Sequence, residues 1–349
     1  MWTFDTGAPV WADALFDGGL VYAGADDGSL HALDAATGRP RWRFRAGGAI
    51  RARPTLSGGD LFLHADDGCL YRLRAADGKQ RWKVPVESKP IRRLPAGDPN
   101  YRFADFASAA AVDRGRLYVG TNDGHVLALD VGSGKKIWDF SAGDTVEATP
   151  VADSRRLYFG SFDGNVYALD TTSGVLLWKH DTGAPVVSTA ALDDGRVIVG
   201  SRSYDLLALD AQTGTPAWTR YIWFSWIESP AAIADGTVYV GSSDAAKLFA
   251  LDARTGGSRW ELDVLGWAWG QPAVSATRVF AGTAGVGQYL VKHQGGVLAV
   301  DRATGAPLWR FPVAAPSDGS VHGFAASPTL GQGLVFIGGL DARVYAFRQ

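Results

Sequence analysis

The sequence is poor in the residues that build disulfides and many metal sites. Its 349 residues include one cysteine, Cys69, and one methionine. A single cysteine excludes an internal disulfide and a cysteine-rich metal site, but it does not indicate a cellular compartment. His31, His64, His125 and His180 fall at unrelated positions of the chain, so no histidine-based metal site is expected.

Charge of one sign and long apolar runs are also lacking. Lys and Arg number 34 against 36 Asp and Glu, with no basic cluster, so nucleic acid is not an expected partner. No apolar run reaches the 18 residues of a membrane span, and the start of the chain does not resemble a signal peptide. No Gly-x-Ser-x-Gly, P-loop or HExxH pattern supports hydrolase, nucleotide or zincin chemistry. We expect a chain that is soluble as written.

The sequence does contain 13 tryptophans, 44 glycines and one recurring sequence motif, which we call the phrase. The phrase is eleven residues long and ends in tryptophan, and its copies read ALDAATGRPRW (32–42), ALDVGSGKKIW (128–138), ALDTTSGVLLW (168–178), ALDAQTGTPAW (208–218), ALDARTGGSRW (250–260) and AVDRATGAPLW (299–309). A degenerate copy, RLRAADGKQRW, occupies residues 72–82. The period is about 40 residues, which is typical of a repeat architecture.

Each repeat predicts four short strands. Runs such as LYVG (117–120) and VYVG (238–241) are rich in β-branched and aromatic residues and precede each phrase. Asp-Gly pairs at 27–28, 67–68, 123–124 and 163–164 predict tight hairpins to the next strand. No stretch has helical periodicity, so the predicted fold is all-β.

Four antiparallel strands repeated every 40 residues predict a β-propeller, in which neighbouring blades bury each other's faces. Eight strands of the VYVG kind indicate eight four-stranded blades in a single domain, residues 1–349. The eighth repeat lacks its outer strand, and the N-terminal strand beginning at Trp2 is expected to complete that last blade and close the ring. The tryptophans expected to dock one blade on the next are Trp2, Trp42, Trp82, Trp138, Trp178, Trp218, Trp260 and Trp309.

The phrase Ala-x-Asp-x-x-Thr-Gly-x-x-x-Trp resembles the tryptophan-docking motif of the pyrroloquinoline quinone (PQQ) type propeller superfamily. That superfamily includes quinoprotein dehydrogenases, the BamB lipoprotein, sensor domains of bacterial Ser/Thr kinases and stand-alone proteins. The resemblance implies a bacterial BamB-like propeller fold over essentially the whole chain. It does not imply one function, because the motif belongs to the scaffold.

Function is expected where the repeats differ. Five tryptophans are surplus to docking: Trp11, Trp223, Trp226, Trp267 and Trp269. All precede an innermost strand, and insertions at about 84–105, 284–296 and 312–324 are expected on the same face of the ring. This arrangement predicts an aromatic-lined funnel, with Phe324 near its wall and a ligand-binding set that comprises Trp11, Arg51, Arg53, Glu147, Trp226, Glu228, Trp267, Trp269 and His322.

Three functions remain open on this evidence. The first is non-catalytic binding of a small apolar or aromatic ligand, or of a protein segment, by a sensor or scaffold. The second is cofactor-free catalysis of a cyclisation or proton transfer, with Glu147, Glu228, Asp105 and Arg51 as candidate catalytic residues. The third is a dehydrogenase that uses PQQ and calcium, for which Asp13 is a further candidate carboxylate. Two features disfavour this function: the chain is short, and it lacks the adjacent-cysteine pair of the alcohol-oxidising members.

No cofactor and no metal ligand is assigned from the residues themselves, and a monomer is expected. The chain starts one residue before a docking tryptophan and stops before an eighth Thr-Gly turn, which suggests a trimmed domain. If it derives from a longer exported or membrane-anchored protein, we expect an extracytoplasmic location. Otherwise the compartment stays open.

Overall fold

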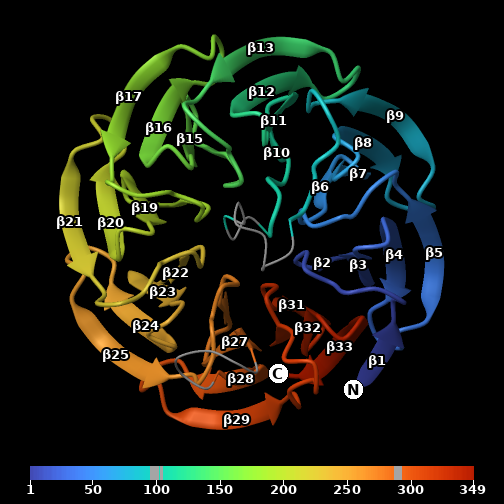
Figure 1. The fold of residues 1–349 in the computed structure, drawn as a ribbon, viewed down its shortest axis with the longest axis vertical. Helices are drawn as coiled ribbons and strands as arrows, with labels where there is room; N and C mark the ends of the chain where they lie inside the picture. The colour runs from blue at the N-terminus through green and yellow to red at the C-terminus, as the bar shows by residue number, and fades with distance from the viewer. Residues whose placement is uncertain (95–101, 103–104, 287–292) are drawn as a thin grey trace.

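Eight four-stranded antiparallel sheets are arranged as the blades of a closed ring (Figure 1), as the sequence predicts. The computed structural model describes residues 1–94, 102, 105–286 and 293–349. Parts of the predicted insertions at 84–105 and 284–296 therefore lie outside the described residues. In the described part of the chain, no helix is long and apolar enough to cross a membrane.

The two inner strands of each blade surround the axis of the ring. The innermost strands are β2 (Leu15–Asp17), β6 (Thr55–Ser57), β10 (Ala111–Asp113), β14 (Val151–Ala152), β18 (Ala191–Asp193), β22 (Ala232–Ala234), β26 (Ala273–Val274) and β31 (Thr329–Gly331). The second strands are β3 (Leu20–Gly24), β7 (Asp60–Ala65), β11 (Arg116–Gly120), β15 (Arg156–Gly160), β19 (Arg196–Gly200), β23 (Thr237–Gly241), β27 (Arg278–Gly285) and β32 (Leu334–Gly339).

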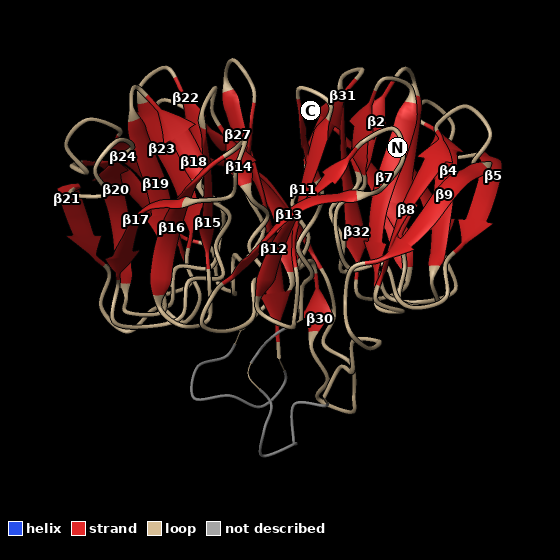
Figure 2. Cartoon of the chain, turned by 90° about the horizontal axis from the view of Figure 1, so that it is seen from above, coloured by secondary structure: helices blue, strands red, loops and turns tan. Residues whose placement is uncertain are grey.

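The two outer strands of each blade form the rim. The third strands are β4 (Ser29–Asp34), β8 (Cys69–Arg74), β12 (His125–Asp130), β16 (Asn165–Asp170), β20 (Asp205–Asp210), β24 (Lys247–Asp252), β28 (Gly296–Asp301) and β33 (Arg343–Arg348). The outermost strands are β5 (Pro40–Arg45), β9 (Gln80–Pro85), β13 (Lys136–Ser141), β17 (Leu176–Asp181), β21 (Pro216–Tyr221), β25 (Ser258–Asp263), β29 (Pro307–Pro312) and β1 (Trp2–Asp5). The short strand β30 (His322–Gly323) pairs with β27 and lies beyond the blades on one face of the ring (Figure 2).

The hydrophobic core lies between blades and not within any one of them. Second and third strands are buried almost throughout, whereas outermost strands such as β5 alternate between exposed and half-buried residues. One cluster, for example, joins Tyr158 of β15 to Val197 and Leu207 of the next blade. Each blade thus buries its faces only against its neighbours, which is why the fold needs a complete ring.

The repeated tryptophan makes the same two contacts in seven of the eight docking positions. The Trp178 Nε1 group donates a hydrogen bond to the Ala211 carbonyl oxygen at 3.1 Å, and the indole ring lies against Gly214, where an added Cβ would be 2.6 Å away. Equivalent Nε1 bonds are made by Trp2, Trp42, Trp82, Trp138, Trp218 and Trp260. Gly214 has φ of +74°, so the Thr-Gly turn both needs glycine for its backbone and leaves a flat surface for the ring.

The eighth docking position differs because the repeat that receives it has no Thr-Gly turn. Trp309 packs instead on Phe347 of β33, with ring centroids 5.7 Å apart. The ring closes beside it, where β1 pairs antiparallel with β33 and places Trp2 opposite Ala346. The prediction that the N-terminal strand completes the last blade is confirmed.

A second glycine contact fixes the position of the connections that lead from one blade to the innermost strand of the next. Gly120 ends the second strand of its blade, and a Cβ there would lie 2.5 Å from Val146 Cγ1 of the next connection. The Val146 amide donates to the Thr121 carbonyl oxygen at 2.9 Å, which holds the connection against the strand end. Val146 is fully buried, so the residue after it, Glu147, emerges at the axis.

Replacing Gly120 with alanine should therefore destabilise the protein by about 2 kcal/mol or more, because Val146 cannot withdraw from a close-packed core. Urea unfolding of Gly120→Ala measures the effect. The matched control is Gly132→Ala on an exposed turn, where the added Cβ meets only Asp130 Oδ1 at 3.3 Å. Equal stability of the two variants would contradict this reading of the contact.

Candidate functional site

A cavity of about 490 Å³ lies where the connections of all eight blades converge. Its lining includes ten residues that the sequence singled out: Trp11, Asp13, Arg51, Arg53, Asp105, Glu147, Trp226, Glu228, Trp267 and Trp269. The insertions contribute to the same cavity through Asp105, Val286 and Val321. The cavity is therefore built mainly from what distinguishes the repeats from one another.

Six lining residues occupy one register position in their blades. Each follows a buried apolar residue that packs on the terminal glycine of the preceding second strand, as Val146 packs on Gly120. The six residues are Trp11, Arg51, Glu147, Val187, Glu228 and Trp269, which follow Val10, Ile50, Val146, Val186, Ile227 and Ala268. The scaffold fixes the backbone at this position and leaves the side chain free to vary, so the position is suited to carrying specificity.

Two tryptophans form a stacked wall on one side of the cavity. The rings of Trp267 and Trp269 lie 4.8 Å apart at 15°, and His293 packs against Trp267 at 4.6 Å. Trp267 Nε1 donates to Asp244 Oδ1 at 3.0 Å, which fixes the ring and one carboxylate together. The buried Nε1 of Trp269 has no hydrogen-bond partner within the described residues, so this wall also presents a polar donor.

A third tryptophan, Trp11, is covered by a guanidinium group. The Arg51 guanidinium carbon lies 4.9 Å from the ring centroid, and Phe106 meets the same tryptophan edge-on at 6.0 Å. Arg51 donates two hydrogen bonds to the Asp26 carboxylate, at 2.9 and 2.8 Å, and one to the Asp105 carbonyl oxygen at 3.1 Å. Arg51 is thereby held in one orientation, with its charge balanced by Asp26.

The fourth tryptophan, Trp226, repeats this arrangement across the cavity. The Arg202 guanidinium carbon lies 4.6 Å from its ring centroid, and Nε donates to Glu228 Oε1 at 2.7 Å. Phe162 lies between Arg202 and Arg102, with their guanidinium carbons 5.1 and 4.6 Å from its ring. Burial raises the pKa of Glu228 even though the Arg202 ion pair opposes this shift.

Glu147 is a buried carboxyl group with few polar contacts to offset the cost of its burial. The residue is 6% exposed, and its Oε1 has no hydrogen-bond partner in the described part of the chain. The nearest ion-pair contact is to Arg93 Nη1 at 3.8 Å, and Arg93 is itself held by Asp66 and by the Phe106 carbonyl oxygen. Burial raises the pKa of Glu147 to about 8, so the group is largely protonated at pH 7.

Three residues named from the sequence lie elsewhere. His322 belongs to β30 and is buried beside the insertion after β27, with its backbone opposite Gly285. Phe324 is fully buried and packs edge-on against Tyr345 at 5.3 Å, within the core between blades. Trp223 is 73% exposed, and its ring packs at a tilt against Tyr221, outside the cavity lining. Their nearness in sequence to the axis does not place them in the cavity lining, although Val321 and Ala325 of the same connection as His322 do line it.

The sequence reasoning missed Arg93, Arg202 and Asp244. Arg202 and Asp66, the partner of Arg93, both occupy the first variable position of the hairpin between second and third strands. The residues at this position are Asp26, Asp66, Asn122, Phe162, Arg202 and Ser243. Aligning these hairpins, as the docking phrases were aligned, would have revealed a second ring of variable residues.

A family model described as outer membrane protein assembly factor BamB matches residues 1–141, 122–225 and 220–349. These matches span the chain. The protein belongs to this family of PQQ-like propellers. No curated protein sequence matches it significantly.

Solved structures confirm the propeller fold. BamB from Moraxella catarrhalis is similar with a TM-score of 0.73 and 19% identity, covering 100% of this chain and 97% of that one. Sqt1 from Saccharomyces cerevisiae has a TM-score of 0.77 and 15% identity, covering 99% and 97%. A quinohemoprotein alcohol dehydrogenase from Pseudomonas putida HK5 has a TM-score of 0.74 and 15% identity, covering 99% and 75%. Such identities establish a shared fold and no shared activity.

The likeness to dehydrogenases raises the question of whether the cavity could hold a metal-bound quinone. Among the residues that the structure describes, no three His, Cys, Asp or Glu side chains are grouped to hold a metal ion. Three of the cavity carboxylates are already engaged: Asp13 accepts from the Ser327 amide, Asp244 from Trp267 and Glu228 from Arg202. The described residues do not fit calcium and PQQ.

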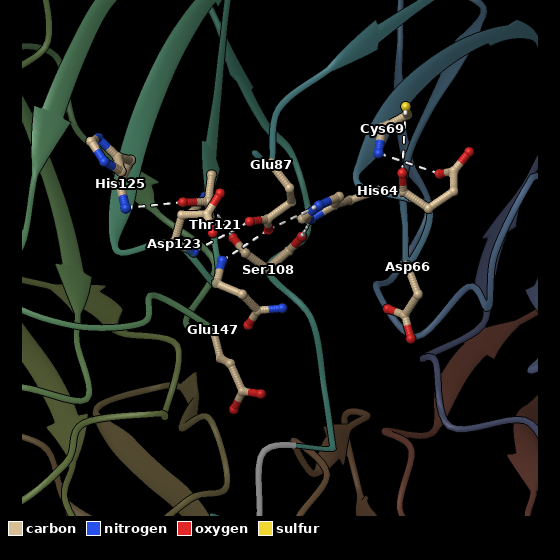
Figure 3. Close-up of polar contacts among 12 residues, drawn as sticks. His64, Asp66, Cys69, Glu87, Ser108, Thr121, Asp123, His125 and Glu147 are labelled. Carbon is tan, nitrogen blue, oxygen red and sulfur yellow. Dashed lines mark hydrogen bonds and ion pairs between the residues drawn. The ribbon is translucent and has the colours of Figure 1, made fainter. Parts of the chain in front are cut away.

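A buried acid and histidine secure the insertion that carries Arg93 and Asp105. His64 occupies the position that terminal glycines hold in other second strands, and it lies between Glu87 and Ser108, near the two ends of the insertion (Figure 3). Nδ1 lies 3.1 Å from the Ser108 carbonyl oxygen, and Nε2 lies 3.5 Å from Glu87 Oε1. A carbonyl oxygen only accepts, so Nδ1 carries the proton. Nε2 has no hydrogen-bond partner among the described residues, and the Glu87 oxygens accept from the Asn122 and Asp123 amides at 2.8 and 3.2 Å.

Glu87 should make stability fall as pH rises. Burial raises its pKa from 4.5 to about 7, so the folded state holds a proton that the unfolded state has lost between these values. The stabilisation is complete below pH 4.5 and disappears as pH rises through about 7, at up to ~1.4 kcal/mol per pH unit. Glu87→Gln mimics the protonated form, so its free energy of unfolding relative to wild type should increase over that range.

Urea unfolding of wild type and Glu87→Gln at pH 5, 6, 7 and 8 tests this expectation. The lowered pKa of buried His64 acts in both proteins, so it largely cancels in the difference. A constant difference at all four pH values would show that Glu87 is ionised throughout.

Proposed function

We propose that the central cavity binds a small apolar or aromatic molecule and that the propeller serves as a binding module, as a sensor or scaffold would. The single observation that carries this proposal is the enclosure of about 490 Å³ by four tryptophans together with fixed polar groups. Cavities of this size with apolar walls and a few oriented polar side chains are typical of small-molecule sites.

The order of the cavity supports binding without rearrangement. Arg51 and Arg202 are each held by a carboxylate, and the stacked pair Trp267 and Trp269 is tied to Asp244. A ligand entering such a site would lose little free energy to ordering the side chains around it. The paired charges would act as fixed polar walls, and the open indole surfaces would supply most of the contact area.

Glu147 supports a second candidate, cofactor-free proton transfer. A carboxyl group with a pKa near 8 inside a closed cavity can both donate and accept a proton near neutral pH. If this is the function, Glu147→Gln should abolish turnover of a bound molecule while leaving its binding in place.

An exposed aromatic group supports a protein partner as a third candidate. Tyr221, Trp223 and Phe224 are 53%, 73% and 46% exposed, and Leu265 beside the next connection is 47% exposed. The family description names an outer-membrane assembly factor, and assembly requires protein contacts. Such contacts would use the surface and not the enclosed cavity.

Trp269→Ala should reduce ligand occupancy at least ten-fold, because it removes one face of the aromatic wall. Native mass spectrometry of the chain purified from its source cells should detect a bound small molecule in wild type and little in this variant. Trp223→Ala is the matched control, since it removes an exposed tryptophan outside the cavity. Equal occupancy in both variants, or no bound molecule in wild type, would contradict the proposal.

A further inference from the structure

The cavity twice combines a tryptophan, a cation on its face and a carboxylate beside that cation. Trp11 carries Arg51 at 4.9 Å with Asp26 as the counter-ion, and Trp226 carries Arg202 at 4.6 Å with Glu228. A cation over an indole face is favourable, most strongly where water is excluded. The protein thus fills two tryptophan sites with its own guanidinium groups.

The wall formed by Trp269 differs from these two sites. No Lys or Arg among the described residues lies over the Trp269 ring, and none of them pairs with Asp244, which accepts a hydrogen bond from Nε1 of Trp267, the ring stacked on Trp269. Both side chains line the cavity. Within the described residues, this part of the site has a tryptophan and a carboxylate, as the other two have, but not a cation.

Glu147 is a second carboxyl group that faces the cavity without a hydrogen bond to Oε1, and it is 94% removed from solvent. A buried polar atom in this state costs free energy unless a partner arrives. The described acids that line the cavity outnumber the arginines that line it: Asp13, Asp105, Glu147, Glu228 and Asp244 stand against Arg51 and Arg53. The missing partner therefore has the chemistry of a cation and not of an anion.

We propose that the ligand of the cavity is an organic cation, with an ammonium group seated against Trp269 beside Asp244 and an apolar or aromatic body lying along the remaining wall. This inference rests on the proposed binding function. The ammonium takes the place that Arg51 and Arg202 take on Trp11 and Trp226. Glu147, on the opposite side, ionises when the cation is bound and adds to the attraction.

Binding should consequently strengthen with pH. Five described charged groups act on Glu147: Arg93, Arg202 and Arg102 lower its pKa, whereas Asp105 and Glu228 raise it, and burial outweighs them all. A permanent cation favours the carboxylate, so its affinity increases as pH rises through about 8. A permanent cation does not itself titrate, so the change must come from the protein.

The experiment compares benzyltrimethylammonium with its neutral isostere neopentylbenzene, by tryptophan fluorescence titration of the full chain between pH 6.5 and 9. We expect the cation to bind at least ten-fold more tightly than the isostere at pH 8.5. Asp244→Asn should weaken the cation about ten-fold and leave the isostere unchanged. Asp263→Asn, at a carboxylate that is 73% exposed on β25, is the matched control.

Glu147→Gln is the second variant, and it should remove the pH dependence of cation binding while keeping the preference for the cation. Equal affinity for the two probes would overturn the inference and leave the proposed binding function standing. If neither probe binds a folded wild type, the cation site is overturned, while native mass spectrometry still decides the binding function. A flat pH profile in wild type would contradict the part assigned to Glu147.

Discussion

The geometry of the cavity depends on one close contact that recurs between neighbouring blades. A glycine ends the second strand, and a buried apolar residue of the next connection occupies the space where a Cβ would lie. The pair is further held by an amide that donates to the carbonyl oxygen following the glycine, as Val146 does to Thr121. Because every atom in this contact is backbone or buried apolar carbon, it does not depend on what the following residue is. The protein can therefore place Trp11, Arg51, Glu147 or Trp269 at equivalent points with the same precision.

The blade that breaks this rule shows how strong the constraint is. Blade two has a buried histidine, His64, at the β7 position that glycine occupies in other blades, one residue before the strand ends at Ala65. The following connection is the longest in the chain, and its ends are held by His64 through Glu87 and Ser108. In this blade a contact between titratable groups takes the place of the steric contact at glycine. The connection that it holds brings Arg93 and Asp105 to the cavity. The titratable contact also makes this part of the wall responsive to protonation in a way that the glycine contacts are not.

The sequence predicted the scaffold almost completely, because the same turn, strand and docking residues recur in each repeat. Asp-Gly turns, β-branched runs and docking tryptophans identify all eight blades and the closure by β1. The cavity was predicted in part, since register alone placed Trp11 and Glu147 at the axis. Register did not place His322 and Phe324, which are not among the lining residues although Val321 and Ala325 of the same connection are. It also could not identify ion-pair partners such as Arg202, because pairing depends on hairpins that approach the connections only in the folded ring.

The separation of scaffold from cavity explains how buried charge is tolerated at the axis. Buried carboxyl groups such as Glu147 are costly, and in a marginally stable domain they persist only where other contacts over-determine the structure. Here the apolar clusters between blades contain docking tryptophans and buried strand residues, and they include none of the cavity tryptophans. Substitutions at the axis can thus change binding without entering the core that holds the ring closed. Members of one family can share this fold and carry different ligands for the same reason, because the residues that select a ligand are not the residues that make the propeller.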